Sequence, residues 1–305
     1  MTTTKIYITP EAPAEVFSAA KSVGADLVSS PAEASGLVWF GHSPASLAEV
    51  LHPGVRWVQL PSAGVEGWLS SGVLVAHPSV VFTSATGSYA DQVAEHALAL
   101  MLSLARQVPA LARTSTWEWV SSASLYGAVV GVVGAGGIGQ ELIRLLAPFR
   151  CRVLAVRRSG VPVSGASETL TPDALDRVLA ESDFVVIGAP ATSETQHLIG
   201  ARELALMQPH AYLVNIARGS LIDTTALVAA LAAGSIAGAG LDVTDPEPLP
   251  DGHPLWSEPR ALITPHSANP THMLYPALAR RVADNITHFT AGKPLLGVVD
   301  PSRGY

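Results

Sequence analysis

The sequence is poor in charge and nearly devoid of cysteine. Charged residues make up 14% of its 305 residues, against about 25% in typical globular proteins, whereas hydrophobic residues make up 48%. This balance excludes intrinsic disorder, which requires low hydrophobicity and high charge. The single cysteine, Cys151, excludes an internal disulfide and every zinc site that is built on paired cysteines.

Clustered basic residues and long apolar runs are also lacking. The formal net charge is -7, whereas nucleic-acid binding requires clustered Lys and Arg to neutralise phosphates. The most apolar helical stretch, residues 97–105, is far shorter than the ~20 residues that span a bilayer. The start, MTTTKIYITP, lacks a basic region followed by an apolar run, so no signal peptide is expected. We therefore expect a cytoplasmic protein with no nucleic-acid or membrane partner.

Short apolar runs alternate with helical patterns over the first ninety residues and again from Ala128. Strands are expected at residues 6–8, 37–40, 57–60, 80–82, 128–133, 153–157, 184–187, 212–216, 237–242 and 261–264. Helices are expected at residues 10–21, 44–51, 90–113, 140–146 and 278–291, with Thr171 and Asp223 capping two more, the second ending at Gly234. Such alternation predicts parallel sheets covered on both faces, and the length suggests two domains.

A glycine-rich segment, GAGGIG at residues 134–139, directly follows the expected strand 128–133. Glycines in this pattern permit a tight turn, close approach of the backbone to a pyrophosphate and tight helix–strand packing. A lone match is weak, but here the preceding strand, the following helix and the later strands accompany it. We therefore expect cofactor contacts from Gly134, Gly136, Gly137, Ile138 and Gly139, with further contacts from Pro190 and Ala217.

The acidic residue that usually ends the second strand of such a domain, where it binds the ribose 2′-hydroxyl, is missing. No Asp or Glu lies between Glu141 and Glu168, and the second strand ends instead in Arg157, Arg158 and Ser159. Two guanidiniums and a hydroxyl suit a 2′-phosphate, which predicts NADP, with NAD still possible. The alternative is a solvated turn that carries two surface arginines.

Three charged groups stand at the ends of three later strands. In the strand order 3-2-1-4-5-6, with residues 184–187 as the third strand, the last three strands are neighbours, and ligands bind beyond their carboxyl ends. Arg218 follows the fourth strand, Asp242 ends the fifth with Glu247 five residues on, and His266 follows the sixth. These groups should therefore converge where a nicotinamide ring would lie.

A cation, a carboxylate and an imidazole at one edge suit the reduction of a carbonyl group. Arg218 can clamp a substrate carboxylate bidentately, His266 can protonate the carbonyl oxygen, and Glu247 beside the imidazole favours its charged form. Taken singly, each residue has another interpretation. Arg218 could cap a helix, Glu247 could be a surface charge, and His266 could be a satisfied buried histidine.

The runs VNIARGSLIDTTAL, GAGLDVTDPEPLP, ITPHSA and GVVGAGGIGQ resemble the D-isomer-specific 2-hydroxyacid dehydrogenase family, most specifically over residues 129–268. The resemblance implies an α/β fold of two Rossmann-like, doubly wound parallel-sheet domains, with the cofactor domain inserted in a discontinuous substrate domain, and usually a dimer. It assigns substrate binding to Arg218, proton transfer to His266, support of that histidine to Glu247, and a nicotinamide contact to Asp242. We place the substrate domain at residues 1–96 and 280–305 and the dinucleotide-binding domain at residues 97–279.

Two further segments carry the resemblance. LPSAGV, residues 60–65, is similar to the family's substrate-domain loop, which implies that Ser62, Ala63 and Gly64 hold the substrate carboxylate through backbone N–H groups. The alternative is an ordinary glycine turn after a strand. The ending VDPSRGY resembles the glyoxylate/hydroxypyruvate reductases, and His266 joins the substrate contacts.

We therefore predict an NADP(H)-preferring homodimeric reductase that converts small 2-keto acids to D-2-hydroxy acids. One alternative is a D-3-phosphoglycerate-type dehydrogenase using NAD, but such an enzyme needs a cationic pocket where Lys5, Lys21 and Arg56 are the only basic residues before Arg106. The other is a non-catalytic nucleotide-sensing binding protein, although the residue types for catalysis are all present.

Other candidate groups have simpler interpretations. The sequence has no HExxH, and His96 stands beside Glu95 alone on the long helix, so no metal is predicted. We interpret His96 and Cys151 as packing residues. Packing is also the favoured interpretation of Trp117 and Trp119, with stacking at a dimer interface near a substrate as the alternative.

Overall fold

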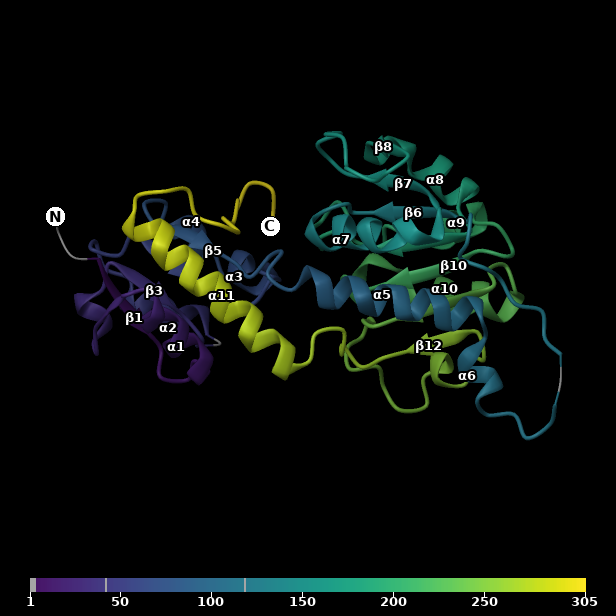
Figure 1. The fold of residues 1–305 in the computed structure, drawn as a ribbon, viewed down its shortest axis with the longest axis horizontal. Helices are drawn as coiled ribbons and strands as arrows, with labels where there is room; N and C mark the ends of the chain where they lie inside the picture. The colour runs from purple at the N-terminus through teal and green to yellow at the C-terminus, as the bar shows by residue number, and fades with distance from the viewer. Residues whose placement is uncertain (1–3, 42, 118) are drawn as a thin grey trace. The chain divides into compact units, whose positions relative to one another are not determined.

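A computed structural model describes residues 4–41, 43–117 and 119–305. The chain divides into two compact units, of which unit 1 comprises Met1–Tyr89 and Pro270–Tyr305 and unit 2 comprises Ala90–Asn269 (Figure 1). Unit 2 is therefore inserted in a discontinuous unit 1, and both are parallel-sheet α/β structures, which confirms the predicted fold class. The predicted boundaries at residues 96/97 and 279/280 fall within helices α5, Ala90–Ala105, and α11, Thr271–Thr290.

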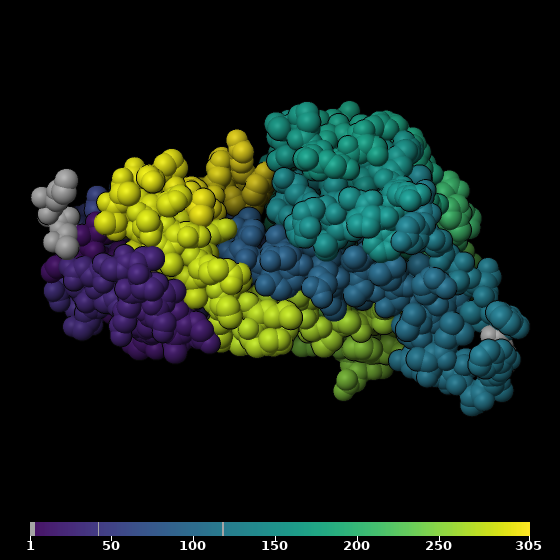
Figure 2. Space-filling model, in the orientation of Figure 1, coloured from purple at the N-terminus to yellow at the C-terminus, as the bar shows by residue number. Residues whose placement is uncertain are grey.

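Unit 1 is built on a five-stranded parallel sheet in the order β2-β1-β3-β4-β5. Its strands are β1 Lys5–Ile8, β2 Asp26–Leu27, β3 Gly36–Val38, β4 Trp57–Gln59 and β5 Val81–Thr83, and its helices besides α11 are α1 Ala14–Ser22, α2 Pro44–Val50, α3 Glu66–Ser70 and α4 Val73–Ala76, with a 3₁₀ turn at Pro31–Glu33. Figure 2 shows α11, in yellow, against the purple N-terminal segment, and α11 packs on α1. The two ends of the chain thus share one core.

Unit 2 contains a seven-stranded parallel sheet in the order β12-β11-β10-β9-β6-β7-β8. Its strands are β6 Val129–Val133, β7 Arg152–Val156, β8 Glu168–Leu170, β9 Phe184–Ile187, β10 Tyr212–Asn215, β11 Gly238–Leu241 and β12 Ala261–Ile263. Its helices are α5, α6 Val108–Leu111, α7 Gly137–Leu146, α8 Leu175–Glu181, α9 Ala201–Leu206 and α10 Thr224–Ala233, with 3₁₀ turns at Ala147–Phe149, Pro172–Ala174, Gly219–Leu221 and Pro254–Trp256. Helix α5 packs on α7 and on strands β10 and β11.

The predicted order of the first strands of this sheet is wrong. The third strand is β8, whereas residues 184–187 form β9, which lies centrally between β6 and β10. Strand β8 is a partly exposed three-residue edge strand that begins with Glu168, so it lacks the apolar run that marks a buried strand. The predicted adjacency of the last three strands, β10, β11 and β12, is confirmed.

The long helix expected at residues 90–113 is interrupted by a change of backbone conformation after Ala105. Helix α5 ends at Ala105, and Gln107 then takes a left-handed conformation with φ of 51° before the short helix α6. Pro109 lies in the first turn of α6, where its missing N–H costs no hydrogen bond. Within the described parts of the chain, no helix combines the length and apolar character needed to cross a membrane.

The two predicted helix caps have different outcomes. Asp223 accepts the Ala226 N–H at 3.0 Å and caps α10, which ends as predicted at Gly234 with φ of 66°. Thr171 is the N-cap residue of the 3₁₀ turn Pro172–Ala174, but its side chain accepts no backbone N–H, and its hydroxyl donates to the carboxylate of Asp173. The predicted cap position is thus confirmed, with Pro172 in the first turn, but the side-chain hydrogen bond of a cap is not formed.

Trp117 and Trp119 do not pack within the chain, so the favoured interpretation of both residues is wrong. Each is 93% exposed. They lie in the segment after α6, which extends away from the sheet of unit 2 (Figure 1). Tyr126 in the same segment is 66% exposed, although its ring also contacts that of Phe149. Large aromatic side chains of this segment are thus exposed in the isolated chain.

Candidate active site

Residues 134–139 form the turn between β6 and α7, and two of its glycines leave no room for a side chain. At Gly134, where φ is 98°, an added Cβ would lie 2.2 Å from the Ala189 nitrogen, and at Gly139 it would lie 2.8 Å from the Gly134 carbonyl oxygen. At Gly136, by contrast, nothing lies within 4 Å of that position. This open face adjoins the first turn of the ten-residue helix α7, whose N–H groups attract phosphate. The segment fits a dinucleotide pyrophosphate.

Two further candidate contacts stand at neighbouring strand ends. Pro190 follows β9 and its carbonyl accepts the Thr195 hydroxyl at 2.7 Å. Ala217 follows β10 and its N–H donates to Asn215 Oδ1 at 3.1 Å. Because β6, β9 and β10 are adjacent parallel strands, both residues lie at the same sheet edge as the glycine turn.

The carboxyl end of β7 carries Arg157, half-buried, followed by the exposed Arg158 and Ser159. Arg158 Nη2 lies 2.9 Å from Glu194 Oε2, in an ion pair whose side chains are 45% and 75% exposed. Exposed pairs of this kind contribute only about 0–1 kcal/mol, so a phosphate could replace Glu194 at little cost. Arg157 and Arg158 follow β7, the strand next to β6, and thus suit a 2′-phosphate.

The three charged strand ends converge as predicted. Asn215, Leu241 and Ile263 stand side by side in the parallel register of β10, β11 and β12. Neighbouring strands are about 4.8 Å apart, so the three ends span roughly 10 Å. Arg218, Asp242 and His266 follow these ends within three residues. The tertiary structure therefore brings the predicted residues of unit 2 to one sheet edge.

His266 and Glu247 form a close pair at this edge. His266 Nδ1 lies 2.7 Å from Glu247 Oε1, and the two side chains are 52% and 42% exposed. The second carboxylate oxygen of Glu247 accepts the Thr244 N–H at 3.3 Å, which holds the carboxylate in place. Because Nδ1 faces the carboxylate, Nε2 is the nitrogen that can exchange a proton with a substrate.

Asp242 is 2% exposed and organises the turn that carries His266. Its Oδ1 accepts the Thr264 hydroxyl at 2.6 Å and the Ser267 N–H at 2.8 Å, and its Oδ2 accepts the Ala268 N–H at 3.1 Å. Burial by itself would raise the pKa of Asp242, but these bonds and one from His96 hold the pKa at about 2. The carboxylate is therefore charged at every physiological pH.

Because the pKa of Asp242 is lowered in the folded state, the free energy of unfolding depends on pH. A carboxylate with a pKa of about 2 when folded and about 3.9 when unfolded contributes about 2 kcal/mol above pH 4, and this is lost as pH falls from about 5 to 2. Asp242→Asn should be less stable at neutral pH and lose less stability on acidification. Urea unfolding at a series of pH values measures both, and parallel pH dependences of the two proteins would contradict this role.

Arg218 begins the 3₁₀ turn Gly219–Leu221 after β10. Its carbonyl accepts the Nδ2 of the fully buried Asn215 at 2.8 Å, and its Nη1 donates to the Ala217 carbonyl at 2.7 Å. An added Cβ at Gly219 would lie 1.9 Å from the Thr244 carbonyl oxygen. The loops of Arg218 and Glu247 thus meet in backbone contact, so displacement of one would displace the other.

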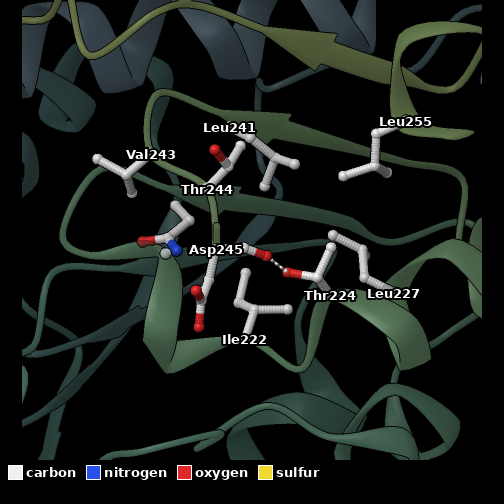
Figure 3. A pocket seen from close by; sticks show the side chains of 10 residues that line it. Ile222, Thr224, Leu227, Leu241, Val243, Thr244, Asp245 and Leu255 are labelled. Carbon is white, nitrogen blue, oxygen red and sulfur yellow. Dashed lines mark hydrogen bonds between the residues drawn. The ribbon is translucent and has the colours of Figure 1, made fainter. Parts of the chain in front are cut away.

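A small pocket lies behind these loops (Figure 3). It is lined by Asn215, Gly219, Ile222, Thr224, Leu227, Leu241, Val243, Thr244, Asp245 and Leu255. Thr224 Oγ1 donates to the Asp245 carbonyl at 2.6 Å, which ties α10 to the loop that carries Glu247 (Figure 3). The side chains are mostly apolar and carry none of the groups proposed for proton transfer, so we assign this pocket to loop support.

In unit 1, the loop at residues 60–65 follows β4. Ser62 Oγ donates to the Gly64 carbonyl at 2.6 Å, and the Ala63 N–H donates to the hydroxyl of Tyr89 at 2.9 Å. A carboxylate bound by this loop would compete with Tyr89 for the Ala63 N–H. The sequence did not identify Tyr89, because 26 residues separate it from Ala63 and no motif joins them.

Two other predictions concern groups outside this edge. Cys151 is half-buried and its thiol donates to the Leu125 carbonyl at 3.2 Å. Burial raises the pKa of Cys151 to about 11, so the thiol stays protonated at neutral pH and is a poor nucleophile. In the described ranges, no group of three or more His, Cys, Asp or Glu side chains is arranged to hold a metal ion.

The interpretation of His96 as a packing residue is incomplete. Its Nε2 lies 2.9 Å from Thr264 Oγ1 and 3.3 Å from Asp242 Oδ1. The sequence offers no signal for this contact, because 168 residues separate His96 from Thr264.

The chain is similar to known proteins over most of its length. The family model described as the NAD binding domain of D-isomer specific 2-hydroxyacid dehydrogenase matches residues 98–268. A glyoxylate reductase from Pyrococcus furiosus is 38% identical over 243 residues, which cover 75% of this chain and 69% of that protein.

Two solved structures are similar over nearly the whole chain. A D-isomer specific 2-hydroxyacid dehydrogenase from Xanthobacter autotrophicus, in complex with NADPH and MES, matches with a TM-score of 0.87 and 30% identity over 100% of both chains. An NADPH-dependent glyoxylate/hydroxypyruvate reductase from Sinorhizobium meliloti, in complex with NADP and sulfate, matches with a TM-score of 0.83 and 27% identity over 99% of this chain and 100% of that chain.

Proposed function

The chain belongs to the D-isomer specific 2-hydroxyacid dehydrogenase family, an NAD(P)-dependent oxidoreductase family, and from that premise we propose that it reduces small 2-keto acids of the glyoxylate or hydroxypyruvate type with NADPH. The product is the D-2-hydroxy acid. One observation carries the proposal: His266, after β12, pairs with Glu247, in the loop after β11, at 2.7 Å, on the sheet edge that also carries Asp242 and Arg218. The similarity to glyoxylate reductases supports the substrate class.

Each residue of this edge has one task in the reaction. Arg218 binds the carboxylate of the keto acid through its planar guanidinium, which orients the carbonyl group. A reduced nicotinamide dinucleotide bound at the glycine turn supplies the hydride. His266 delivers the Nε2 proton to the carbonyl oxygen, and Glu247 orients the imidazole through Nδ1. Glu247 is thus a positioning residue, whereas Arg218 and His266 touch the substrate.

We assign dinucleotide binding to unit 2, and to the loop at residues 60–65 in unit 1 we assign the capacity to bind a carboxylate. The loop offers backbone N–H groups at Ser62, Ala63 and Gly64. These are neutral hydrogen-bond donors that can bind a carboxylate. For Asp242, the Oδ2 atom that accepts the Ala268 N–H has a second lone pair, which suits the amide N–H of a nicotinamide.

A panel of 2-keto acids assayed with NADPH and NADH tests the proposed function directly. We expect turnover of glyoxylate and hydroxypyruvate with NADPH. Faster oxidation of 3-phosphoglycerate with NAD would favour the alternative dehydrogenase. Tight NADPH binding without any turnover would favour a nucleotide-sensing protein.

Cofactor choice is expected to follow the arginine pair. Hydrogen bonds to charged groups contribute roughly 1.5–3 kcal/mol each, so one or two imply an about 10- to several-hundred-fold preference for NADPH over NADH. Solvent screening should hold the preference near the lower limit, and it should shrink as salt rises. Arg157→Asp should shift the preference toward NADH and leave the range of keto acids unchanged.

Ratios of kcat/KM for the two cofactors at low and high salt measure this effect. Arg280→Asp is the control. Arg280 is exposed on α11 in unit 1, so this variant makes the same charge change outside the unit proposed to bind the dinucleotide. Equal use of NADH and NADPH by the wild type at low ionic strength would identify Arg157 and Arg158 as surface residues.

We also propose that the protein is a homodimer in which a second copy covers the exposed aromatic segment after α6. Trp117 and Trp119 are each 93% exposed, and large exposed apolar side chains of this kind suit an interface. Sedimentation of the wild-type chain at micromolar concentration tests this, since a monomeric mass would contradict it.

A further inference from the structure

The backbone of His266 is held in an uncommon conformation. Its φ is 49°, in the left-handed region that residues other than glycine seldom occupy. Its N–H donates to the Asp242 carbonyl at 2.8 Å. The next two N–H groups, of Ser267 and Ala268, donate to the two oxygens of the Asp242 carboxylate. The orientation of that carboxylate therefore determines where the imidazole of His266 points.

The Asp242 carboxylate is in turn oriented from the other side of the turn. Thr264 donates its hydroxyl proton to Oδ1 at 2.6 Å, so the Thr264 oxygen is left to accept a bond. His96 Nε2 lies 2.9 Å from that oxygen and 3.3 Å from Asp242 Oδ1. Both atoms are acceptors toward His96, so Nε2 carries a proton and is shared between them.

This contact links helix α5 to the proton donor. His96 lies on α5, which packs on the sheet through β10 and β11, and its side chain is only 22% exposed. His96 is not part of the glycine turn, the arginine pair or the groups proposed to bind the substrate carboxylate. A buried polar contact that merely filled space would cost desolvation, whereas this one satisfies the acceptors that fix the turn.

We propose that His96 is a positioning residue for proton transfer, which acts through Thr264 and Asp242 to hold the turn that aims His266 at the substrate. The proposal rests on the proposed function for its kinetic consequences. Its structural part, the ordering of residues 264–268, does not depend on any activity. Loss of the contact should therefore lower kcat, because misplacement of a reacting group slows the chemical step. It should leave keto-acid KM and NADPH affinity unchanged.

Three substitutions separate this role from simple packing. His96→Leu removes the donor and keeps apolar volume. His96→Gln places an amide nitrogen near the position of Nε2 and should restore the contact, whereas His96→Asn keeps a polar group that is too short to reach. The control is His210→Leu, which removes an imidazole that lies 2.9 Å from Asp183 elsewhere in unit 2.

We expect His96→Leu and His96→Asn to lower kcat by about 10-fold or more, and His96→Gln to return it to within about threefold of wild type. KM for the keto acid and the Kd for NADPH, titrated by fluorescence, should change less than about twofold. Amide hydrogen exchange at Ser267 and Ala268 should accelerate in the Leu and Asn variants only. His210→Leu should match wild type in every measurement.

Several results would overturn the proposal. These are wild-type kcat and exchange in His96→Leu, an equal loss in His96→Gln and His96→Leu, or an effect confined to KM. If His96→Leu fails to fold, the Asn and Gln pair decides the question. If the wild type reduces no keto acid, the proposed function fails, and the exchange measurement still tests the ordering of the turn.

Discussion

The His266→Ala variant is expected to reduce 2-keto acids with a kcat at least about 10²-fold below wild type, the usual scale of general acid catalysis. His266 lies three residues after the end of β12, and its Nδ1 pairs with Glu247 at 2.7 Å. Methyl replacement removes the proton donor without filling the site. NADPH affinity should be retained, because the glycine turn and the arginine pair lie on other strands.

Steady-state kinetics and fluorescence titration of NADPH together test this assignment. His210→Ala is a matched control, since its imidazole is also exposed and also faces a carboxylate, that of Asp183 at 2.9 Å. Near-normal turnover in His266→Ala would assign proton transfer to another group. Loss of NADPH binding in the same variant would point to a disrupted fold at the strand ends.

Arg218→Lys should lower kcat/KM for 2-keto acids by about 10²-fold, mainly by raising KM. Breaking a desolvated, hydrogen-bonded charge pair costs about 2–5 kcal/mol, and an ammonium cannot reproduce the planar fork that grips both carboxylate oxygens. The hydrogen bond from the Asn215 side-chain amide to the Arg218 carbonyl, 2.8 Å, remains in this variant. The loop itself should therefore keep its shape.

The same role restricts the substrates of the wild type. Neutral aldehydes lack the carboxylate and should be poor substrates, whereas 2-keto acids should be good ones. Arg260→Lys serves as the control, because this arginine bonds the Leu231 carbonyl at 3.1 Å and is partly exposed. A wild type that reduces neutral aldehydes as efficiently as keto acids would contradict carboxylate binding by Arg218.

Local patterns were sufficient to predict most of the secondary structure and the edge where the candidate residues meet. The apolar runs of β6, β9 and β10 are fully or nearly fully buried, and a buried parallel strand must be apolar on both faces. The glycine turn, Pro190 and Arg218 follow these three runs within three residues. Because parallel strands align their carboxyl ends, order along the chain was enough to predict convergence.

The errors arise where no local signal exists. Strand β8 is short, lies at the edge of the sheet and is partly exposed, so burial does not demand an apolar run there, and residues 184–187 were given its place. Thr171 occupies the expected N-cap position, but its side chain accepts no backbone N–H. Trp117 and Trp119 are large and apolar, which by itself favours burial, yet both are 93% exposed.

By itself, the sequence determined the apolar strands, the glycine turn and the residue types that follow those strands, because these depend on neighbours within a few positions. Only the tertiary structure decided which atoms meet. The pairing of His266 with Glu247, 19 residues apart, and the contact of His96 with Thr264, 168 residues apart, depend on how separate loops and helices pack. Packing sets such distances to fractions of an ångström, and no local pattern encodes that precision.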